Sequence, residues 1–176
     1  SVPRVRAVLA QEPALAAELV EPAAEALLAP LVAPPLTPHQ AVGLDLILEG
    51  FLLHHGHPRH LSPNEPGREV LAGDYCYAHG LVRIAEAGDL FVIEALADLI
   101  ALGAGVVAAG RREALTPLWR ATAAAIAARG STDADAVGAS LIEAKRRLRV
   151  DGDPSGVVEV AARLPPTPGL AEAFGE

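Results

Sequence analysis

The sequence predicts an all-α protein that folds as one domain. Of its 176 residues 36 are Ala, Leu is also abundant and β-branched runs are few, a composition that favours helices over sheets. Pro and Gly divide the chain into seven or eight segments of helical character and leave no convincing strand. A chain of this length can bury one core without disulfides, and its single cysteine, Cys76, has no internal partner.

The first part of the chain contains two segments rich in Ala and Leu, residues 3–10 and 13–32. Pro22 and Pro30 fall inside the second segment, and a proline in a helix interior breaks or kinks the helix. We therefore expect short or kinked helices here rather than one rod.

A capping box marks the start of a longer helix. Thr37 stands three residues before Gln40 and is followed by Pro38. The Thr37 hydroxyl can accept from a free helix N–H while Gln40 reaches back. This helix is expected from Pro38 to about His54, and residues 56–67, with three prolines and two glycines, are expected to form a loop.

Capping residues also divide the second half of the chain. A helix is expected from about Arg68 to Glu86, where Gly88 ends it, and Asp89 caps the next one, which continues to about Gly110.

Capping residues mark three further helix starts. Thr116-Pro117 begins a helix that ends at Gly130, Thr132 caps the next helix, and Asp153-Pro154 begins a short last helix. The residues from Pro165 onward are expected to be loosely ordered. The helical domain is thus predicted over 1–164, with a tail over 165–176.

Charge and hydropathy exclude two classes of partner. The formal net charge is −8 and the pI is near 5.2, whereas binding a phosphate backbone needs clustered Lys and Arg. The longest uncharged apolar run, Leu99–Ala109, has 11 residues, short of the roughly 20 that span a bilayer. We expect neither nucleic-acid binding nor a transmembrane segment. Because the sequence does not open with a basic segment followed by an apolar one, we expect a reducing cytoplasm.

Small residues recur every fourth position in the helix that follows Asp89: Ala97, Ala101, Gly105 and Ala109. They give that helix one face with almost no side chain, which another helix can approach closely. Two interpretations stay open, an ordinary core helix of an Ala-rich protein or a contact with another subunit.

Four histidines lie within the seven residues from His54 to His60. Imidazoles ligate Zn or Ni, and His55 with His57, or His57 with His60, could converge from a loop. No Cys, Asp or Glu is close in sequence to complete a ligand set. The alternative is a solvated helix end, and we assign no metal ligand.

Two helices carry carboxylates four residues apart, Asp45 with Glu49 and Glu94 with Asp98. Such pairs share a helix face and can chelate Mg or divide acid and base work. The apolar residues around them favour the simpler interpretation, the wet side of an amphipathic helix. The sequence contains no Gly-rich phosphate loop, no Gly-x-Ser-x-Gly and no Asp-Asp-x-x-Asp motif.

The segment Leu71-Ala72-Gly73-Asp74-Tyr75, followed by Gly88-Asp89, resembles trans-polyprenyl diphosphate synthases. In that superfamily a Leu-Ala-Gly-Asp-Tyr run opens a helix that ends at a Gly-Asp turn. The helix ending at His54 resembles the one that in catalytic members ends in His before the first Asp-rich motif. Here His55 and Gly56 stand where the metal-binding aspartates would be, and the interval to Asp74 is shorter than in catalytic members. The resemblance covers about residues 41–119.

This combination resembles the small, non-catalytic component of bacterial two-component hexaprenyl or heptaprenyl diphosphate synthases. The resemblance implies a truncated isoprenoid-synthase-like bundle that acts as the regulatory subunit of a larger catalytic partner in quinone side-chain synthesis. Ionising an allylic diphosphate requires Mg held by aspartates. We therefore assign no catalytic residue and no cofactor to this chain, and we expect Mg in the partner. Asp74 is then a structural carboxylate bonded to neighbouring helices.

The residues just before the first Asp-rich motif line the elongation tunnel in this superfamily, which makes Phe51, Leu52 and Leu53 tunnel candidates. The alternative is that Phe51 is a core residue. Two other functions stay open: a free-standing helical protein that binds an isoprenoid or another apolar ligand, and a metalloprotein that uses the histidine cluster. Self-association of the isolated chain also stays open.

Overall fold

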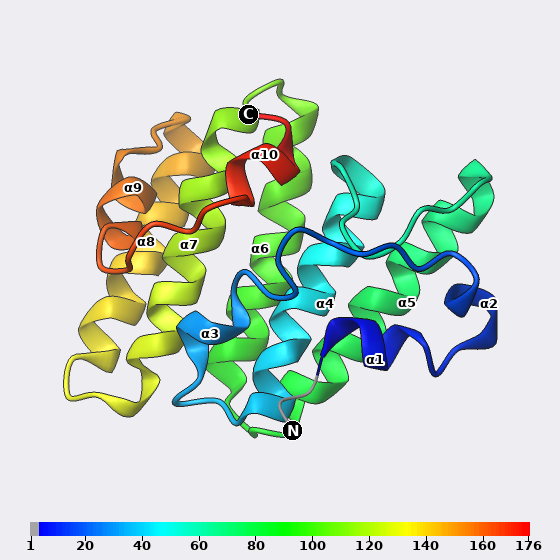
Figure 1. Ribbon diagram of the computed structural model, residues 1–176. Helices are drawn as coiled ribbons and strands as arrows, with labels where there is room; N and C mark the ends of the chain where they lie inside the picture. Colours follow the sequence, from blue (N-terminus) through cyan, green and yellow to red (C-terminus); the bar gives the residue numbers. More distant parts are fainter. Residues whose placement is uncertain (1–3) are drawn as a thin grey trace.

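The computed structural model describes residues 4–176, and its regular elements there are all helical, as predicted (Figure 1). Two 3-10 turns, η1 (Arg112–Ala114) and η2 (Ala128–Gly130), flank α7. The α-helices are α1 (Val5–Leu9), α2 (Pro13–Ala16), α3 (Ala29–Val32), α4 (Pro38–His55), α5 (Pro66–Ala85), α6 (Leu90–Ala108), α7 (Leu115–Ala127), α8 (Ala134–Asp151), α9 (Ser155–Ala161) and α10 (Leu170–Phe174).

The central helix is α4. Thr37 caps it as predicted, because the Thr37 hydroxyl accepts from the Gln40 N–H at 3.3 Å and the Gln40 side-chain oxygen accepts from the Thr37 N–H at 3.0 Å. Every residue from Ala41 to Leu53 is buried. A helix that is covered on all sides also buries its polar side chains. Asp45 and Glu49 therefore lie in the protein interior.

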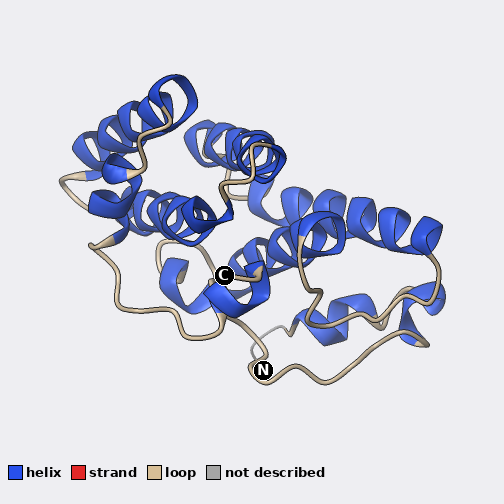
Figure 2. Ribbon diagram, turned by 90° about the horizontal axis from the view of Figure 1, so that it is seen from above, coloured by secondary structure: helices blue, strands red, loops and turns tan. Residues whose placement is uncertain are grey.

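The long helices form two groups (Figure 2). α5 runs antiparallel along α4, and this pair extends away from a second group made of α7, α8 and α9. α6 lies between the groups and contacts α4, α5 and α7. The core is therefore continuous from α4 through α6 to α7.

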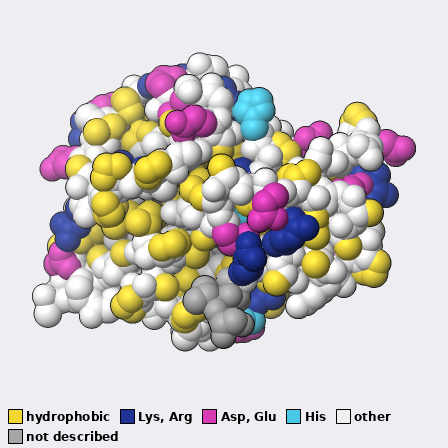
Figure 3. All heavy atoms as spheres, in the orientation of Figure 1, with side chains coloured by type: hydrophobic (Ala, Val, Ile, Leu, Met, Phe, Trp, Pro, Cys, Tyr) yellow, Lys and Arg dark blue, Asp and Glu magenta, His cyan; other side chains and the backbone are white. Residues whose placement is uncertain are grey.

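The N-terminal segment forms a layer over α4 and α5. It contains only the short helices α1, α2 and α3, and Ala17–Leu28 is not helical, which confirms the prediction of short pieces. Within the described chain the one β pairing is an isolated antiparallel bridge between Leu19 and Leu61. The expected first helix begins at Val5, and its predicted start at Pro3 lies outside the described residues. Acidic and basic side chains gather over this layer (Figure 3), where Arg4 and Arg6 pair with Glu21 and Glu25.

The prediction of a loosely ordered tail over 165–176 is wrong. The tail ends in α10, which packs against α4 and α7 with Leu170 and Phe174 fully buried. The chain turns into α10 at Gly169, whose φ of +90° suits glycine. The Arg112 guanidinium fixes the end of the helix, since its Nε donates to the Phe174 carbonyl at 2.9 Å. The burial of Leu170 and Phe174 stabilises this segment despite the prolines that precede it.

Helix starts differ from the predicted ones by one or two residues. α5 begins at Pro66 instead of Arg68, and α7 begins at Leu115 after the turn η1. The N-cap of α8 is Asp133 rather than Thr132. These shifts leave the order and type of the elements unchanged.

One helix of the described chain, α6, is long and apolar enough to cross a membrane by length and composition alone, with a mean hydropathy of 2.2 over its best 18 residues. Of that window 39% is buried. The buried positions face the bundle and are Val92, Ala95, Leu96, Leu99, Leu102, Gly103 and Val106. The core helix of a soluble protein has this same composition, and Asp98 interrupts the apolar run.

Candidate functional site

Glycines let α4 and α5 approach each other closely. A Cβ on Gly43 would lie 2.6 Å from the Gly80 carbonyl oxygen, and a Cβ on Gly80 would lie 2.6 Å from that of Gly43. One heptad further along, a Cβ on Gly50 would lie 2.9 Å from the Gly73 carbonyl oxygen. Real Cβ atoms are not found so close to backbone, so each position requires glycine. This crossing holds the two segments that carry the resemblance in register.

At one end of this crossing His54 meets the Gly-Asp pair of α5. His54 Nε2 lies 3.2 Å from Asp74 Oδ1, and the imidazole stacks on Tyr77 with ring centroids 5.3 Å apart. A Cβ on Gly73 would lie 2.6 Å from His54 Nε2, so the imidazole occupies the space that glycine leaves. Asp74 is exposed to solvent on its outer side. This contact links α5 to α4, and the structural role expected for Asp74 stays a prediction.

Tyr75, the third residue of the motif, faces away from this cluster. Its ring stacks on His79 at 4.0 Å between centroids and borders a hollow beside α2. Burial raises the pKa of the Tyr75 phenol, and the negative charge of Glu12 adds to the effect. The structure thus brings together His54, Gly73 and Asp74 but not Tyr75.

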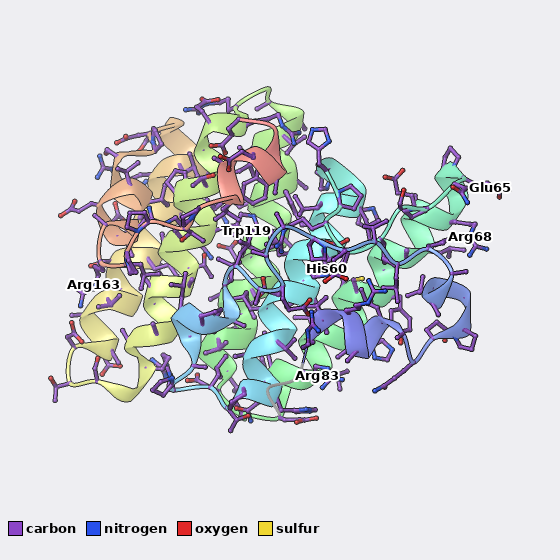
Figure 4. The ribbon with its side chains drawn as sticks, viewed as in Figure 1. His60, Glu65, Arg68, Arg83, Trp119 and Arg163 are labelled. Carbon is purple, nitrogen blue, oxygen red and sulfur yellow. The ribbon has the colours of Figure 1, made fainter. Side chains whose placement is uncertain are left out.

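The other histidines of the cluster do not converge. The His55 ring lies tilted against that of Phe51, with ring centroids 4.8 Å apart, and burial lowers the His55 pKa, helped by the nearby charges of His54 and Arg112. His57 is exposed, whereas His60 lies wholly buried beneath the N-terminal layer (Figure 4). Over residues 4–176 no three His, Cys, Asp or Glu side chains are placed to hold a metal ion.

His60 is also unusual as a buried base. Neither ring nitrogen has a hydrogen-bond partner among the described atoms. Burial, reinforced by the positive charge of Arg59, lowers the pKa of His60 to about 4. The imidazole is therefore neutral at pH 7 and acts as a packing residue.

The expectation that Asp45 and Glu49 lie on a wet helix face is wrong, because both are 1% exposed. Asp45 accepts from the backbone N–H groups at the start of α3, with its shortest bond at 2.7 Å to Ala29. Glu49 accepts from three successive N–H groups of the loop that follows α4, those of Arg59, His60 and Leu61. These carboxylates act as anchors for backbone that has no secondary structure of its own to satisfy it.

Burial is the larger influence on both carboxyl groups. It raises the pKa of Asp45 and of Glu49, and the amide donors and the charge of Arg59 oppose it. The lone pairs of both groups are already engaged by backbone, so neither side chain is free to chelate an ion. The second pair, Glu94 and Asp98, does face solvent as expected, and Asp98 pairs with Lys145 and Arg149 of α8.

Phe51, Leu52 and Leu53 are core residues in this fold. Phe51 is fully buried, its ring lies against Gly103 of α6, and it makes edge contacts with Trp119 at 5.3 Å and Phe174 at 5.9 Å. Leu52 and Leu53 are 0% and 4% exposed. All three side chains therefore contribute to the buried apolar clusters.

The small-residue face of α6 lies on the surface. Ala97, Ala101, Gly105 and Ala109 are all exposed, and a Cβ on Gly105 would have nothing within 4 Å. Because these four residues are exposed, the interpretation of this face as packed core is wrong. The close helix crossing is made instead by α4 and α5. Half-buried apolar side chains border the face: Ile93, Ile100, Ala104 and Val107. A second chain could pack here without disturbing the fold.

Comparisons with known proteins give no match: no family model, no curated protein and no solved structure is similar to this chain. The functional argument therefore depends on the residues and their geometry.

Two pairs of glycines in the sequence indicate the close crossing of α4 and α5. Gly43 and Gly50 lie seven residues apart, as do Gly73 and Gly80. Matching heptads of glycine on consecutive helices predict an antiparallel crossing. The anchoring roles of Asp45 and Glu49 had no local signal, because their partners are backbone groups of irregular segments 10 to 18 residues away.

Proposed function

We propose that this chain is the non-catalytic, regulatory subunit of a heterodimeric long-chain polyprenyl diphosphate synthase. Such an enzyme builds the isoprenoid side chains of quinones such as menaquinone, and this subunit helps to set the length of the product. One observation supports the proposal most. The two segments that resemble the synthases, the His54 end of α4 and the Gly73-Asp74 turn of α5, pack against each other, 20 residues apart in sequence and 3.2 Å apart in space.

The positions and bonding of the acidic residues support a non-catalytic role. Ionising an allylic diphosphate requires Mg ions held by several carboxylates. The buried carboxylates of α4, Asp45 and Glu49, are engaged by backbone N–H groups. Asp74 contacts the His54 imidazole, and His55 and Gly56 follow His54 where catalytic members carry aspartates. The proposal therefore places Mg and the reacting diphosphate in the larger partner subunit.

The exposed face of α6 supports a role as a subunit. Large exposed apolar patches mark interaction sites. The exposed face of α6 presents alanines and Gly105 to an approaching helix. Small side chains allow close backbone approach. We assign the contact with the catalytic subunit to this face, with pairing of two copies of this chain as the competing arrangement.

Copurification tests the assignment. The tagged chain is coexpressed with the Asp-rich polyprenyl synthase of the same genome, and the two are expected to copurify. Gly105→Leu should abolish copurification without lowering the melting temperature, because the new side chain projects from the α6 surface. Ala139→Leu, on the exposed side of α8, is the matched control and should bind normally.

Two results would overturn the proposal. One is the absence of any complex under conditions in which both chains are folded. The other is an isoprenoid bound stoichiometrically by this chain alone, which would identify a free-standing binding protein. A Gly105→Leu variant that still copurifies would overturn the assignment of the α6 face.

A further inference from the structure

Residues 4–26, the cover segment, contribute to only one of the two apolar clusters of the described chain. The main core contains side chains from Leu27 onward. The second cluster lies where the cover segment crosses α4 and α5 (Figure 1). The segment contributes Val5, Val8, Leu9 and Leu15 to it, and the side chains beneath them include Leu46 and Cys76. Lifting the cover segment would therefore leave the main core intact.

The cover segment has little secondary structure of its own. Its helices α1 and α2 have five and four residues, and helices this short are unstable in isolation. Two backbone hydrogen bonds join it to the loop after α4: the Val20 N–H donates to the His60 carbonyl at 2.9 Å, and the Ser62 N–H donates to the Glu18 carbonyl at 2.8 Å. The segment keeps its shape because it is docked, so its residues should undock together.

Two arginines make the side-chain attachments of the cover segment. Arg68 pairs with Glu18 and donates from Nη2 to the Ala14 carbonyl at 2.9 Å, and the Arg59 guanidinium donates to the Ala24 carbonyl. Arg68 is exposed to solvent (Figure 4), and ion pairs that reach the surface stabilise a fold only weakly. These attachments therefore add little to the apolar contact.

His60 makes the closed arrangement costly. It is fully buried under the cover segment, and neither ring nitrogen has a hydrogen-bond partner among the described atoms. A buried polar group without a partner costs free energy that water would recover. Opening the cover segment would admit that water to the imidazole.

A fixed point follows the cover segment directly. Asp45 accepts from the backbone N–H groups of Leu27, Leu28 and Ala29, which hold this part of the chain against α4. Leu28 is also fully buried in the main core. The chain before Leu27 can therefore move without pulling α3 away from the bundle.

We propose that the cover segment is a detachable lid, which opens as one unit at Leu27 while the helical bundle stays folded. Opening uncovers the apolar strip of α4 and α5 that contains Leu46 and Cys76. The lid thus controls access to a second apolar surface. It lies apart from the α6 face, so it stands or fails independently of the proposed subunit role.

The rate at which Cys76 reacts with 4,4′-dithiodipyridine tests the lid. Cys76 is fully buried in the closed form, and burial raises the pKa of its thiol, so it reacts only after opening. A second reporter is Thr122→Cys in a Cys76→Ala chain, because Thr122 is fully buried on α7. Without denaturant, Cys76 should react at least about tenfold faster than the thiol of that variant, since a local opening is more frequent than global unfolding.

A matched pair of substitutions separates the lid from the bundle. Leu9→Ala, in the cover segment, should speed the reaction of Cys76 at least about tenfold and leave the Thr122→Cys reporter unchanged. Leu148→Ala, in the main core on α8, should speed the Thr122→Cys reporter and leave Cys76 unchanged. If a leucine variant fails to fold, the two reporters without it still decide. Equal rates at the two reporters, or a Leu9→Ala effect of the same size on both, would overturn the proposal.

Discussion

Two buried acids show how single residues support irregular backbone in this protein. Asp45 and Glu49 lie one turn apart on α4, and each carboxylate accepts N–H groups of three successive residues, one set from the N-terminal layer and one from the loop after α4. Those N–H groups would otherwise be buried without partners. The N-terminal layer therefore depends on α4 through charge-assisted hydrogen bonds as well as through apolar contact.

Replacing one of these acids should destabilise the fold strongly. Asp45→Ala removes the acceptor of three N–H groups, and leaving buried donors unsatisfied costs about 1–3 kcal/mol each. We expect the free energy of unfolding to fall by at least about 2 kcal/mol in urea titrations followed by circular dichroism. Glu94→Ala, at an exposed acid of α6, should stay within about 0.5 kcal/mol of the parent. Equal effects of the two substitutions would show that Asp45 does not anchor the layer.

The only lysine of the chain, Lys145, supplies a pH-dependent contribution. It is 3% exposed, its Nζ donates to the Ala95 carbonyl at 2.8 Å, and burial lowers its pKa from 10.5 to about 8. The charged form is thus disfavoured in the native state. That cost is present in full below pH 8 and disappears as the pH rises from 8 to 10.5.

Lys145→Met should therefore be more stable than the parent at pH 7, by up to about 3 kcal/mol at roughly 1.4 kcal/mol per pKa unit. The difference should vanish near pH 10.5. Val150→Met, at an exposed position of the same helix, changes no titratable group, so its difference from the parent should stay flat. A constant Lys145→Met difference across this pH range would contradict the assignment.

Phe51 allows its two proposed roles to be separated. Its complete burial against Trp119 and Phe174 predicts a loss of about 3–5 kcal/mol of stability for Phe51→Ala. If Phe51 also limits chain growth, the folded complex with the catalytic subunit should give a shifted product distribution. A destabilised subunit whose complex makes products of unchanged length would refute the tunnel role.

Among the helices, the glycine crossing of α4 and α5 and the small-residue face of α6 look alike in sequence but differ in structure. Both carry small side chains at regular intervals. Gly80 faces the Gly43 carbonyl, while Gly105 faces open space. A helical repeat identifies a face but not what covers it.

A matched pair of substitutions measures this difference. Gly80→Ala should destabilise the protein by about 1–3 kcal/mol, since its Cβ would meet backbone at 2.6 Å. Gly105→Ala should stabilise it by about 0.5–1 kcal/mol through helix propensity. Thermal melts of both variants check the pair, and the opposite ranking would exclude the close crossing.

The contrast between Gly80 and Gly105 also shows which features of the fold could be predicted from the sequence. Caps and prolines predicted the long helices to within a residue or two, because those signals are local: Thr37 with Gln40, and Asp89 at the start of α6. The burial of Asp45 and the folding of α10 depend on contacts between segments far apart in the chain. Periodicity carries no information about such contacts, so the wet face assigned to Asp45 and the loose tail were both wrong.

For the whole molecule, the described chain has a main core, a second apolar cluster beneath the anchored N-terminal layer, and an uncovered helix face. The segments on which the proposed function rests form the α4 and α5 pair, while the face proposed for the partner lies on α6. Under the proposed function, this chain would influence its partner through the contact at α6 and through the shape of the His54 end of α4. It would not bind the diphosphate itself.

An elongation assay tests the proposed subunit role most directly. Farnesyl diphosphate, isopentenyl diphosphate and Mg are incubated with this chain alone, with the Asp-rich synthase of the same genome alone, and with both together. We predict no elongated product from this chain alone and, from the mixture, product of a rate or length that the synthase alone does not give. Turnover by this chain alone, or a mixture indistinguishable from the synthase alone, would contradict the proposed function.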